Sequence, residues 1–294
     1  MCGFDCERAV IYFAIMGILN CLSVVCQQSP PKTIFAVDDR PTLSSNTLSD
    51  LKNSAGTEIK ERLPNSSFTL NNLGVTLAKE GQYEQAARIL KQAAELSPEL
   101  YQAHRNLSIV YEALKQPSDS LASARRAVEV APKHPVALMQ WCDVALSFSL
   151  RPKEAVLCFE RLKAIEPLDL TTTGLYGIAL YRMGEYDKAQ QHLEKACIGP
   201  NENPDYLNVL GLTHFQKKSY KIAAEYFKRA VEIAPDRVTF RYNLGMAQIA
   251  NKNRPGALSQ YRLLKESDPK LAKKLYPLLY GHLLVSVEEL KDRR

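Results

Sequence analysis

The chain has 294 residues, of which 46% are hydrophobic and 24% are charged, and both values are ordinary for a globular protein. Its formal net charge of +6 comes from lysines and arginines that alternate with acidic residues, as in Lys79-Glu80 and Lys153-Glu154. This alternation excludes the clustered basic stripe of a nucleic-acid-binding surface, so no nucleic-acid partner is expected.

A dense apolar segment lies near the start of the chain. No charged residue occurs between Arg8 and Lys32, and the stretch from Ala9 to Val25 is almost entirely apolar. It is close to the shortest length that spans a membrane and somewhat long for the apolar region of a signal peptide. The residues that follow are mostly polar, so they provide no apolar surface that would bury this segment in a core. We therefore expect membrane anchoring or export, to a periplasmic or other extracytoplasmic space, through residues 9–25.

Three forms of this N-terminal segment, residues 1–30, remain open. It is an uncleaved anchor in the form of a transmembrane helix, a cleaved signal peptide, or a lipoprotein signal that ends at Cys26. Val25 argues against the lipoprotein form, because a small residue usually precedes the lipidated cysteine. The acidic residues Asp5 and Glu7 argue against the cleaved form, because signal peptides begin with positive charge.

Residues 31–66 are predicted to be a flexible polar linker. They are rich in serine, threonine and asparagine and show no sustained apolar face of a helix. Such a linker would hold the following residues away from a membrane surface.

A period of 34 residues runs through residues 67–271. Each unit opens with a large apolar residue and Gly, continues with Ala and a second large apolar residue, and closes with Pro. The three clearest units carry this pattern at Leu73, Gly74, Ala86, Leu90 and Pro98, at Leu210, Gly211, Ala223, Phe227 and Pro235, and at Leu244, Gly245, Ala257, Tyr261 and Pro269. Self-similarity at this period predicts stacked helical hairpins.

Glycine is expected at the turn of each hairpin, where the backbone leaves the right-handed helical region. Gly81 and Gly184 fit this position, whereas Lys218 and Lys252 replace the glycine in the last two repeats. The sequence therefore predicts a departure from the common turn in those two repeats.

The third repeat departs from the pattern in its register. The spacing from Pro132 predicts that Trp141 is a core residue and Cys142 the small residue, whereas counting back from Phe159 shifts the register by one and turns Trp141 toward the inner surface. We favour the core position for Trp141, and we expect one extra residue to be absorbed in the turn at 147–152.

The seven cysteines contain no C-x-x-C pair, so neither a zinc ribbon nor a thioredoxin-like motif is expected. Cys142, Cys158 and Cys197 fall within helical patterns, where a small apolar thiol usually fills the core. In an exported chain, a disulfide between Cys142 and Cys158 is conceivable, and the sequence leaves its geometry open.

Sequence motifs for catalysis are lacking. The five histidines form no ligand pair at helical spacing, and there is no H-E-x-x-H, P-loop, G-x-S-x-G or dinucleotide fingerprint. We therefore expect no enzymatic activity, no cofactor and no metal site.

The repeats resemble the tetratricopeptide repeat family over residues 67–271, about 70% of the chain. The resemblance implies an all-α, right-handed α-solenoid of about six helical hairpins, and residues 272–294 are expected to form a C-terminal capping helix, since a solenoid needs an end unit. A partner-binding helix is the alternative for that segment.

In this family the first helix of each repeat lines the concave groove, so the resemblance implies the position of a partner-binding site. The candidate groove residues are Asn72, Arg105, Asn106, Leu175, Ile178, Tyr181, Arg182, Asn208, Val209, Leu212 and Asn243. The groove is expected to be polar toward its ends and apolar in the middle.

Asparagines recur at one position of the repeat, at Asn72, Asn106 and Asn243. Asparagine is a mediocre helix former, and its amide satisfies both donors and acceptors of an extended peptide. This recurrence resembles the asparagine ladder of the O-linked N-acetylglucosamine transferase repeats. Solvated asparagines and ordinary packing are the alternative interpretation.

The resemblance implies a non-catalytic scaffold that binds a peptide or helix of another protein in its groove, with the membrane as a second partner through the N-terminal segment. Two alternatives remain: a lipoprotein-like structural component of an envelope, secretion or pilus assembly, and a substrate-selecting partner of a transferase.

Overall fold

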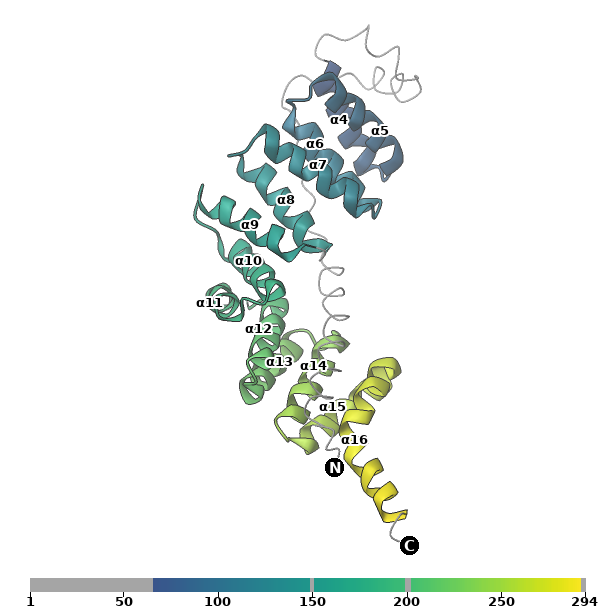
Figure 1. Ribbon diagram of the computed structural model, residues 1–294. Coiled ribbons are helices and arrows are strands. Elements are labelled where there is room, and N and C mark those ends of the chain that lie inside the picture. Colours follow the sequence, from purple (N-terminus) through teal and green to yellow (C-terminus); the bar gives the residue numbers. More distant parts are fainter. Residues whose placement is uncertain (1–65, 149–150, 199–201, 292–294) are drawn as a thin grey trace. The chain divides into compact units, whose positions relative to one another are not determined.

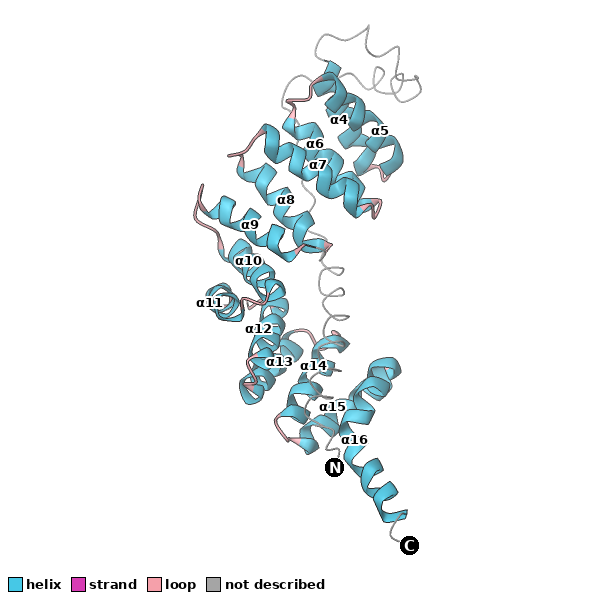
Figure 2. Ribbon diagram, in the orientation of Figure 1, coloured by secondary structure: helices cyan, strands magenta, loops and turns pink. Residues whose placement is uncertain are grey.

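The computed structural model describes residues 66–148, 151–198 and 202–291, with side chains as far as Tyr280 (Figure 1). This described part is helical, with short connecting turns and no strand (Figure 2). None of its helices combines the length and apolarity that crossing a bilayer requires. The predicted anchor or signal at 9–25 and the linker at 31–66 lie outside the described residues, apart from Ser66.

The helices divide between two compact units, which meet in sequence at Leu168 and Asp169. The N-terminal unit contains three hairpins: α4 (Ser66–Lys79) with α5 (Tyr83–Leu96), α6 (Tyr101–Ala113) with α7 (Pro117–Val130), and α8 (Pro135–Ser147) with α9 (Pro152–Lys163). The C-terminal unit contains α10 (Leu170–Met183) with α11 (Tyr186–Ala196), α12 (Pro204–Gln216) with α13 (Tyr220–Ile233), α14 (Val238–Ala250) with α15 (Arg254–Ser267), and the single helix α16 (Pro269–Lys291).

Within each unit the hairpins follow one packing rule. The second helix of a hairpin packs against its own first helix and against the first helix of the next hairpin, and successive first helices also touch. Each hairpin thereby buries its apolar faces against a neighbour, which is how a solenoid gains stability. The all-α solenoid of six helical hairpins is confirmed.

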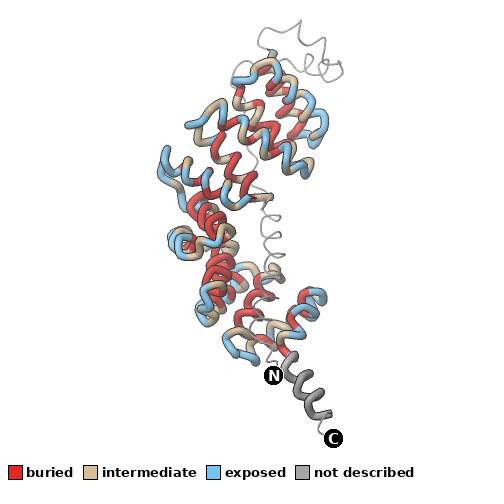
Figure 3. Tube along the Cα trace, viewed as in Figure 1, coloured by how far each residue is buried: buried red, intermediate tan, exposed pale blue. Residues whose placement is uncertain are grey.

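Glycines of the repeat pattern lie where the two helices of a hairpin approach most closely. A Cβ atom placed on Gly74 would lie 2.5 Å from Leu90 Cγ, and one on Gly211 would lie 2.6 Å from Phe227 Cδ1. Leu90 and Phe227 are themselves buried. The second helices bury only a narrow stripe, such as Ala223, Phe227 and Ala230 in α13 (Figure 3), as expected of an amphipathic helix.

The turns keep one conformation although their residues differ. Gly184 follows α10 with a φ of 87°, in the left-handed region, and Lys218 and Lys252 adopt a φ of 59° at the equivalent place. The predicted departure at these lysines is therefore a difference in residue type only. A non-glycine residue in this region costs roughly 1–2 kcal/mol, which the packing on both sides of the turn offsets.

The third hairpin absorbs its extra residue in its turn. Four residues separate Ser147 from Pro152, one more than separate α4 from α5, α6 from α7, α12 from α13 or α14 from α15. Trp141 is only 6% exposed, and Cys142 is fully buried at the small-residue position. The predicted core position of Trp141 and the extra residue at 147–152 are both confirmed.

Helix α16 begins like another first helix and covers the last hairpin. Leu271, Leu275 and Leu279 are buried, and the helix packs against α14 and α15. A Cβ on Gly245 would meet Leu275 Cδ2 at 2.9 Å, so α16 occupies the place that the first helix of a next repeat would take. This packing is what a capping role requires.

Candidate partner-binding site

The sequence-predicted groove residues all lie on first helices, but the two units hold them separately. The N-terminal unit brings together Asn72 on α4 with Arg105 and Asn106 on α6. The C-terminal unit holds the remaining eight, with Leu175, Ile178, Tyr181 and Arg182 on α10, Asn208, Val209 and Leu212 on α12, and Asn243 on α14. Each unit therefore carries a first-helix face of its own.

The recurrent asparagines join neighbouring first helices. Asn106 Nδ2 donates to Asn71 Oδ1 at 2.9 Å, and Asn243 Nδ2 donates to Asn208 Oδ1 at 2.8 Å. All four side chains are at most 3% exposed. Packing between hairpins thus accounts for these amides, because a buried amide must find a hydrogen-bond partner inside the protein. Their contact with a bound peptide stays a prediction, as it does for half-buried Asn72.

A charged cluster lies on the first-helix face of the N-terminal unit. Glu112 on α6 accepts hydrogen bonds from Gln140 and Ser147 on α8, and burial nevertheless raises its pKa. Burial, and then the nearby charge of Glu112, raise the pKa of Asp143 to about 7, although Arg105 opposes the shift. Burial lowers the pKa of the Arg105 guanidinium. The hydrogen bonds to Glu112 and the charge of Arg105 therefore offset only part of the effect of burial on these two carboxyl groups.

The sequence reasoning missed Asp143 and Glu112, although a signal for Asp143 was available. Asp143 directly follows the small residue of its repeat. In the other hairpins this position holds an apolar side chain, at Val75, Ile109, Ile178, Leu212 and Met246. A carboxyl group at a position that is otherwise apolar marks a polar site once the register of the third repeat is known.

The first-helix face of the C-terminal unit is mainly apolar. Ile178 and Tyr181 on α10, with Leu212 and Phe215 on α12, are each at most 8% exposed. Burial raises the pKa of Tyr181, which is hydrogen-bonded to Gln216 on α12. These four side chains belong to the buried core of the unit, so their contact with a partner helix or peptide stays a prediction.

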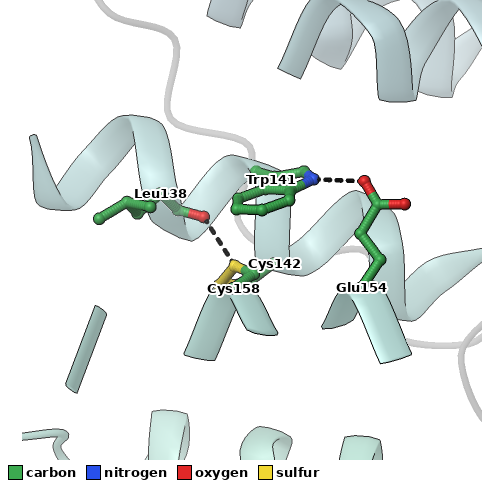
Figure 4. The surroundings of a disulfide bond; sticks show 5 residues. All are labelled: Leu138, Trp141, Cys142, Glu154 and Cys158. Carbon is green, nitrogen blue, oxygen red and sulfur yellow. Dashed lines mark hydrogen bonds between the residues drawn. A yellow bond between two sulfur atoms is a disulfide. The ribbon is translucent and has the colours of Figure 1, made fainter. Parts of the chain in front are cut away.

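A disulfide between Cys142 and Cys158 connects the two helices of the third hairpin (Figure 4). Their Cα atoms are 5.4 Å apart, within the usual range for a disulfide. Cys158 Sγ also lies 3.3 Å from the Leu138 carbonyl oxygen, to which it donates only in the reduced form, because a disulfide carries no S–H. The structure thus contains the disulfide that the sequence left open, with a Cα separation that suits it.

Cys197 is a free thiol in the described part of the chain. Burial, and then the charge of Glu202, raise its pKa to about 11. The nucleophilic thiolate is therefore scarce at neutral pH, and Cys197 is expected to be unreactive.

Family models for the tetratricopeptide repeat match residues 77–141, 177–238 and 222–272. Together these ranges span more than half of the chain, and they include parts of both units.

The curated relatives include two proteins named as members of complexes and one named as a biogenesis protein. The chain is 27% identical over 237 residues to anaphase-promoting complex subunit 3 of Schizosaccharomyces pombe, which covers 77% of this chain and 35% of the relative. It is 31% identical over 132 residues to cytochrome c-type biogenesis protein CycH of Pseudomonas aeruginosa, and the match covers 43% of this chain and 32% of CycH. It is 22% identical over 265 residues to BBSome complex member BBS4 of Bos taurus, and the match covers 78% of this chain and 49% of BBS4. The chain thus spans a third to a half of the length of these relatives.

Solved structures share the fold at low identity. The type IV pilus biogenesis factor PilW aligns with a TM-score of 0.61 and 19% identity, covering 74% of this chain and all of PilW. MamA from Desulfovibrio magneticus aligns with a TM-score of 0.52 and 22% identity, covering 58% of this chain and 96% of MamA. At such identities the likeness concerns the fold alone. With six helical hairpins, the residue pattern of each repeat and the matching family models, this chain is a tetratricopeptide repeat protein.

Proposed function

We propose that this protein is a non-catalytic scaffold that binds a peptide or helix of another protein through its first-helix faces. The observation that carries this proposal is the contrast between the two faces. The face of the N-terminal unit includes half-buried Glu112 and Asp143 beside buried Arg105. The face of the C-terminal unit includes half-buried Leu175 with buried Ile178 and Leu212. Partner segments that offer basic groups to the first face, or apolar side chains to the second, would each gain several modest contacts.

The relatives support a role in binding proteins. Those named above are subunits of the anaphase-promoting complex and of the BBSome, and the solved structure of YrrB is described as a tetratricopeptide repeat protein with an unusual peptide-binding site. YrrB shares 19% identity with this chain at a TM-score of 0.50. These descriptions make a protein ligand the natural choice for this chain.

A structural role in an envelope assembly is the second candidate. Two observations favour it: CycH and PilW are named as biogenesis factors, for cytochrome c and for type IV pili, and the disulfide between Cys142 and Cys158 suits an oxidising compartment. Export or membrane anchoring through residues 9–25 belongs to the proposal in both candidates.

The first-helix faces can be tested with a double variant and a matched control. Glu112→Arg with Leu175→Asp reverses one charge and removes one apolar contact, at half-buried positions on α6 and α10. Glu84→Arg with Ile222→Asp makes the same two chemical changes at exposed positions on the second helices α5 and α13. Full-length protein in each form is crosslinked in native cells and recovered, after circular dichroism has shown equal helix content.

We expect the partner to be captured by the unmodified protein and by the control, and to be lost with the first-helix variant. Capture that is equal in all three forms would refute binding through the first-helix faces and would favour the assembly role. The N-terminal segment is tested separately by fractionation and by the intact mass of the mature protein. An unshortened, unlipidated chain in the soluble cytoplasmic fraction would refute anchoring and export.

A further inference from the structure

The third hairpin carries a cavity whose lining includes none of the predicted groove residues. Its volume is about 360 Å³, and its walls come from α7, the turn after α7, α8 and α9. The lining residues are Arg125, Val128, Glu129, Pro132, Trp141 and Arg161. This volume falls within the range of ligand pockets.

Trp141, which lines this cavity, stands where other repeats have leucine or tyrosine. Its indole Nε1 donates to Glu154 Oε1 at 2.7 Å (Figure 4). The Nε and Nη2 atoms of Arg125 donate to the two oxygens of Glu154 at 2.6 Å each. Burial alone would raise the pKa of Glu154, but the hydrogen bonds from Arg125 and Trp141 outweigh it and lower that pKa. Glu154 therefore fixes the indole in one orientation, with Arg125 beside it.

The opposite wall of the cavity holds an arginine with a free charge. Arg161 Cζ lies 5.5 Å from the centre of the Trp141 ring, which is a cation–π contact. Its Nη2 donates to the Pro132 carbonyl oxygen at 3.3 Å, and no carboxylate in the described residues lies within 4.0 Å of it. The other charges nearby are paired: Arg125 and Arg151 with Glu154, and Arg126 with Glu129. Four arginines thus stand against two glutamates, which leaves an excess of two positive charges, and Arg161 is the one arginine of the four that forms no ion pair with the described residues.

A second cavity of about 140 Å³ lies on the other side of Arg125, which lines both. Its walls are mainly apolar and include Leu121, Val144 and Phe148. Leu157 on α9, which is 50% exposed, stands three residues after Glu154 and four before Arg161, so helical spacing places it on the same stripe. Because Arg125 lines both cavities, two apolar side chains of one peptide segment can occupy them together.

We propose that this second-helix surface is a separate binding site for an acidic peptide segment of a partner protein. A large apolar side chain of the segment fills the larger cavity against Trp141, and a neighbouring carboxylate pairs with Arg161. A second apolar side chain occupies the smaller cavity beyond the Arg125–Glu154 ion pair. This site is independent of the first-helix faces.

Binding can be measured with peptides of defined composition and the full-length protein. The probes are dye-labelled peptide amides with acetylated ends, in which two apolar residues (phenylalanine, leucine or methionine) alternate with glutamates. Matched peptides carry glutamine in place of every glutamate. Anisotropy of the dye gives the affinity, and fluorescence of Trp141, the only tryptophan of the chain, reports whether the peptide sits in the larger cavity.

The chain offers a close control for Arg161. Arg241 Nη2 also donates to a proline carbonyl oxygen, that of Pro235, at 3.3 Å, and it lines neither cavity. We expect Arg161→Gln to weaken binding of the acidic peptide by about fivefold or more, since it removes one charge-assisted contact. Arg241→Gln should leave the affinity unchanged within about twofold, because Arg241 belongs to the other unit and lines neither cavity.

Three results would overturn the proposal. The first is the absence of saturable binding by any acidic peptide up to about 1 mM, the weakest affinity worth assigning. The second is equal affinity for the glutamate and glutamine peptides, or for the native chain and the Arg161→Gln variant. The third is that 3-phenylpropionate, a small aromatic carboxylate, competes as strongly as the best peptide, since the smaller cavity would then contribute nothing to binding.

Discussion

Reduction of the Cys142–Cys158 disulfide is expected to destabilise the third hairpin by about 2–3 kcal/mol. The two cysteines are 16 residues apart in sequence, and a cross-link that closes a loop of this size contributes about 3 kcal/mol by restricting the unfolded chain. The reduced form regains a weak hydrogen bond from Cys158 Sγ to the Leu138 carbonyl oxygen, at 3.3 Å, worth at most about 0.5–1 kcal/mol. The contribution of the cross-link less that of the regained hydrogen bond is the expected loss of stability on reduction.

Urea unfolding followed by tryptophan fluorescence measures this loss directly. Trp141 is the only tryptophan and lies in the same hairpin as the disulfide, so its emission reports local unfolding of the third repeat. The protein is compared with and without dithiothreitol, and Cys197→Ala serves as the control because that thiol is free. Equal unfolding midpoints in both conditions, or alkylation of Cys142 and Cys158 before any reduction, would refute the reasoning.

Two further predictions concern one buried contact and one titrating group. Gly211→Ala should cost up to about 2 kcal/mol, because its Cβ would meet the buried Phe227 ring at 2.6 Å and overpacking of about 1–3 kcal/mol is offset by a gain of about 1 kcal/mol in helix propensity. Gly256→Ala, whose Cβ would meet the ends of the Asn253 and Gln248 side chains, has the same gain without contact to a buried ring, so it should be less destabilising in the same urea assay. Burial, and then the Glu112 charge, raise the folded-state pKa of Asp143 to about 7, above an unfolded value of about 3.9. Stability should therefore fall as pH rises from about 4 to 7, by at most about 4 kcal/mol, and Asp143→Asn should remove this slope in unfolding curves at several pH values; an unchanged slope would contradict the assignment.

Residue patterns local to each repeat were enough to predict the hairpins. The spacing of apolar and small residues, such as Leu73 and Gly74 before Leu90, is dictated by contacts inside one hairpin, and it recurs because every hairpin solves the same packing problem. The extra residue near Ser147 could be counted in the same way. The helix that covers the last hairpin was visible for a similar reason, since Leu275 continues the apolar stripe of a first helix.

The residue pattern of the repeat did not predict the contacts between hairpins. Asn106 and Asn243 were grouped correctly by their position in the repeat, but their hydrogen-bond partners, Asn71 and Asn208, stand one position earlier in the preceding hairpin. Sequence spacing gives the face of a helix on which a side chain lies. It does not give the offset between two neighbouring helices, which the packing of many side chains decides together.

The sequence alone determined the tetratricopeptide hairpins, the core position of Trp141 and the helix that covers the last hairpin, because each depends on residues close together in the chain. Only the tertiary structure decided that Cys142 bonds to Cys158, that Asp143 lies near Glu112 and Arg105, and that a cavity opens beside Arg161. Each of these depends on distances between side chains of different helices, and such distances are fixed only when the helices pack.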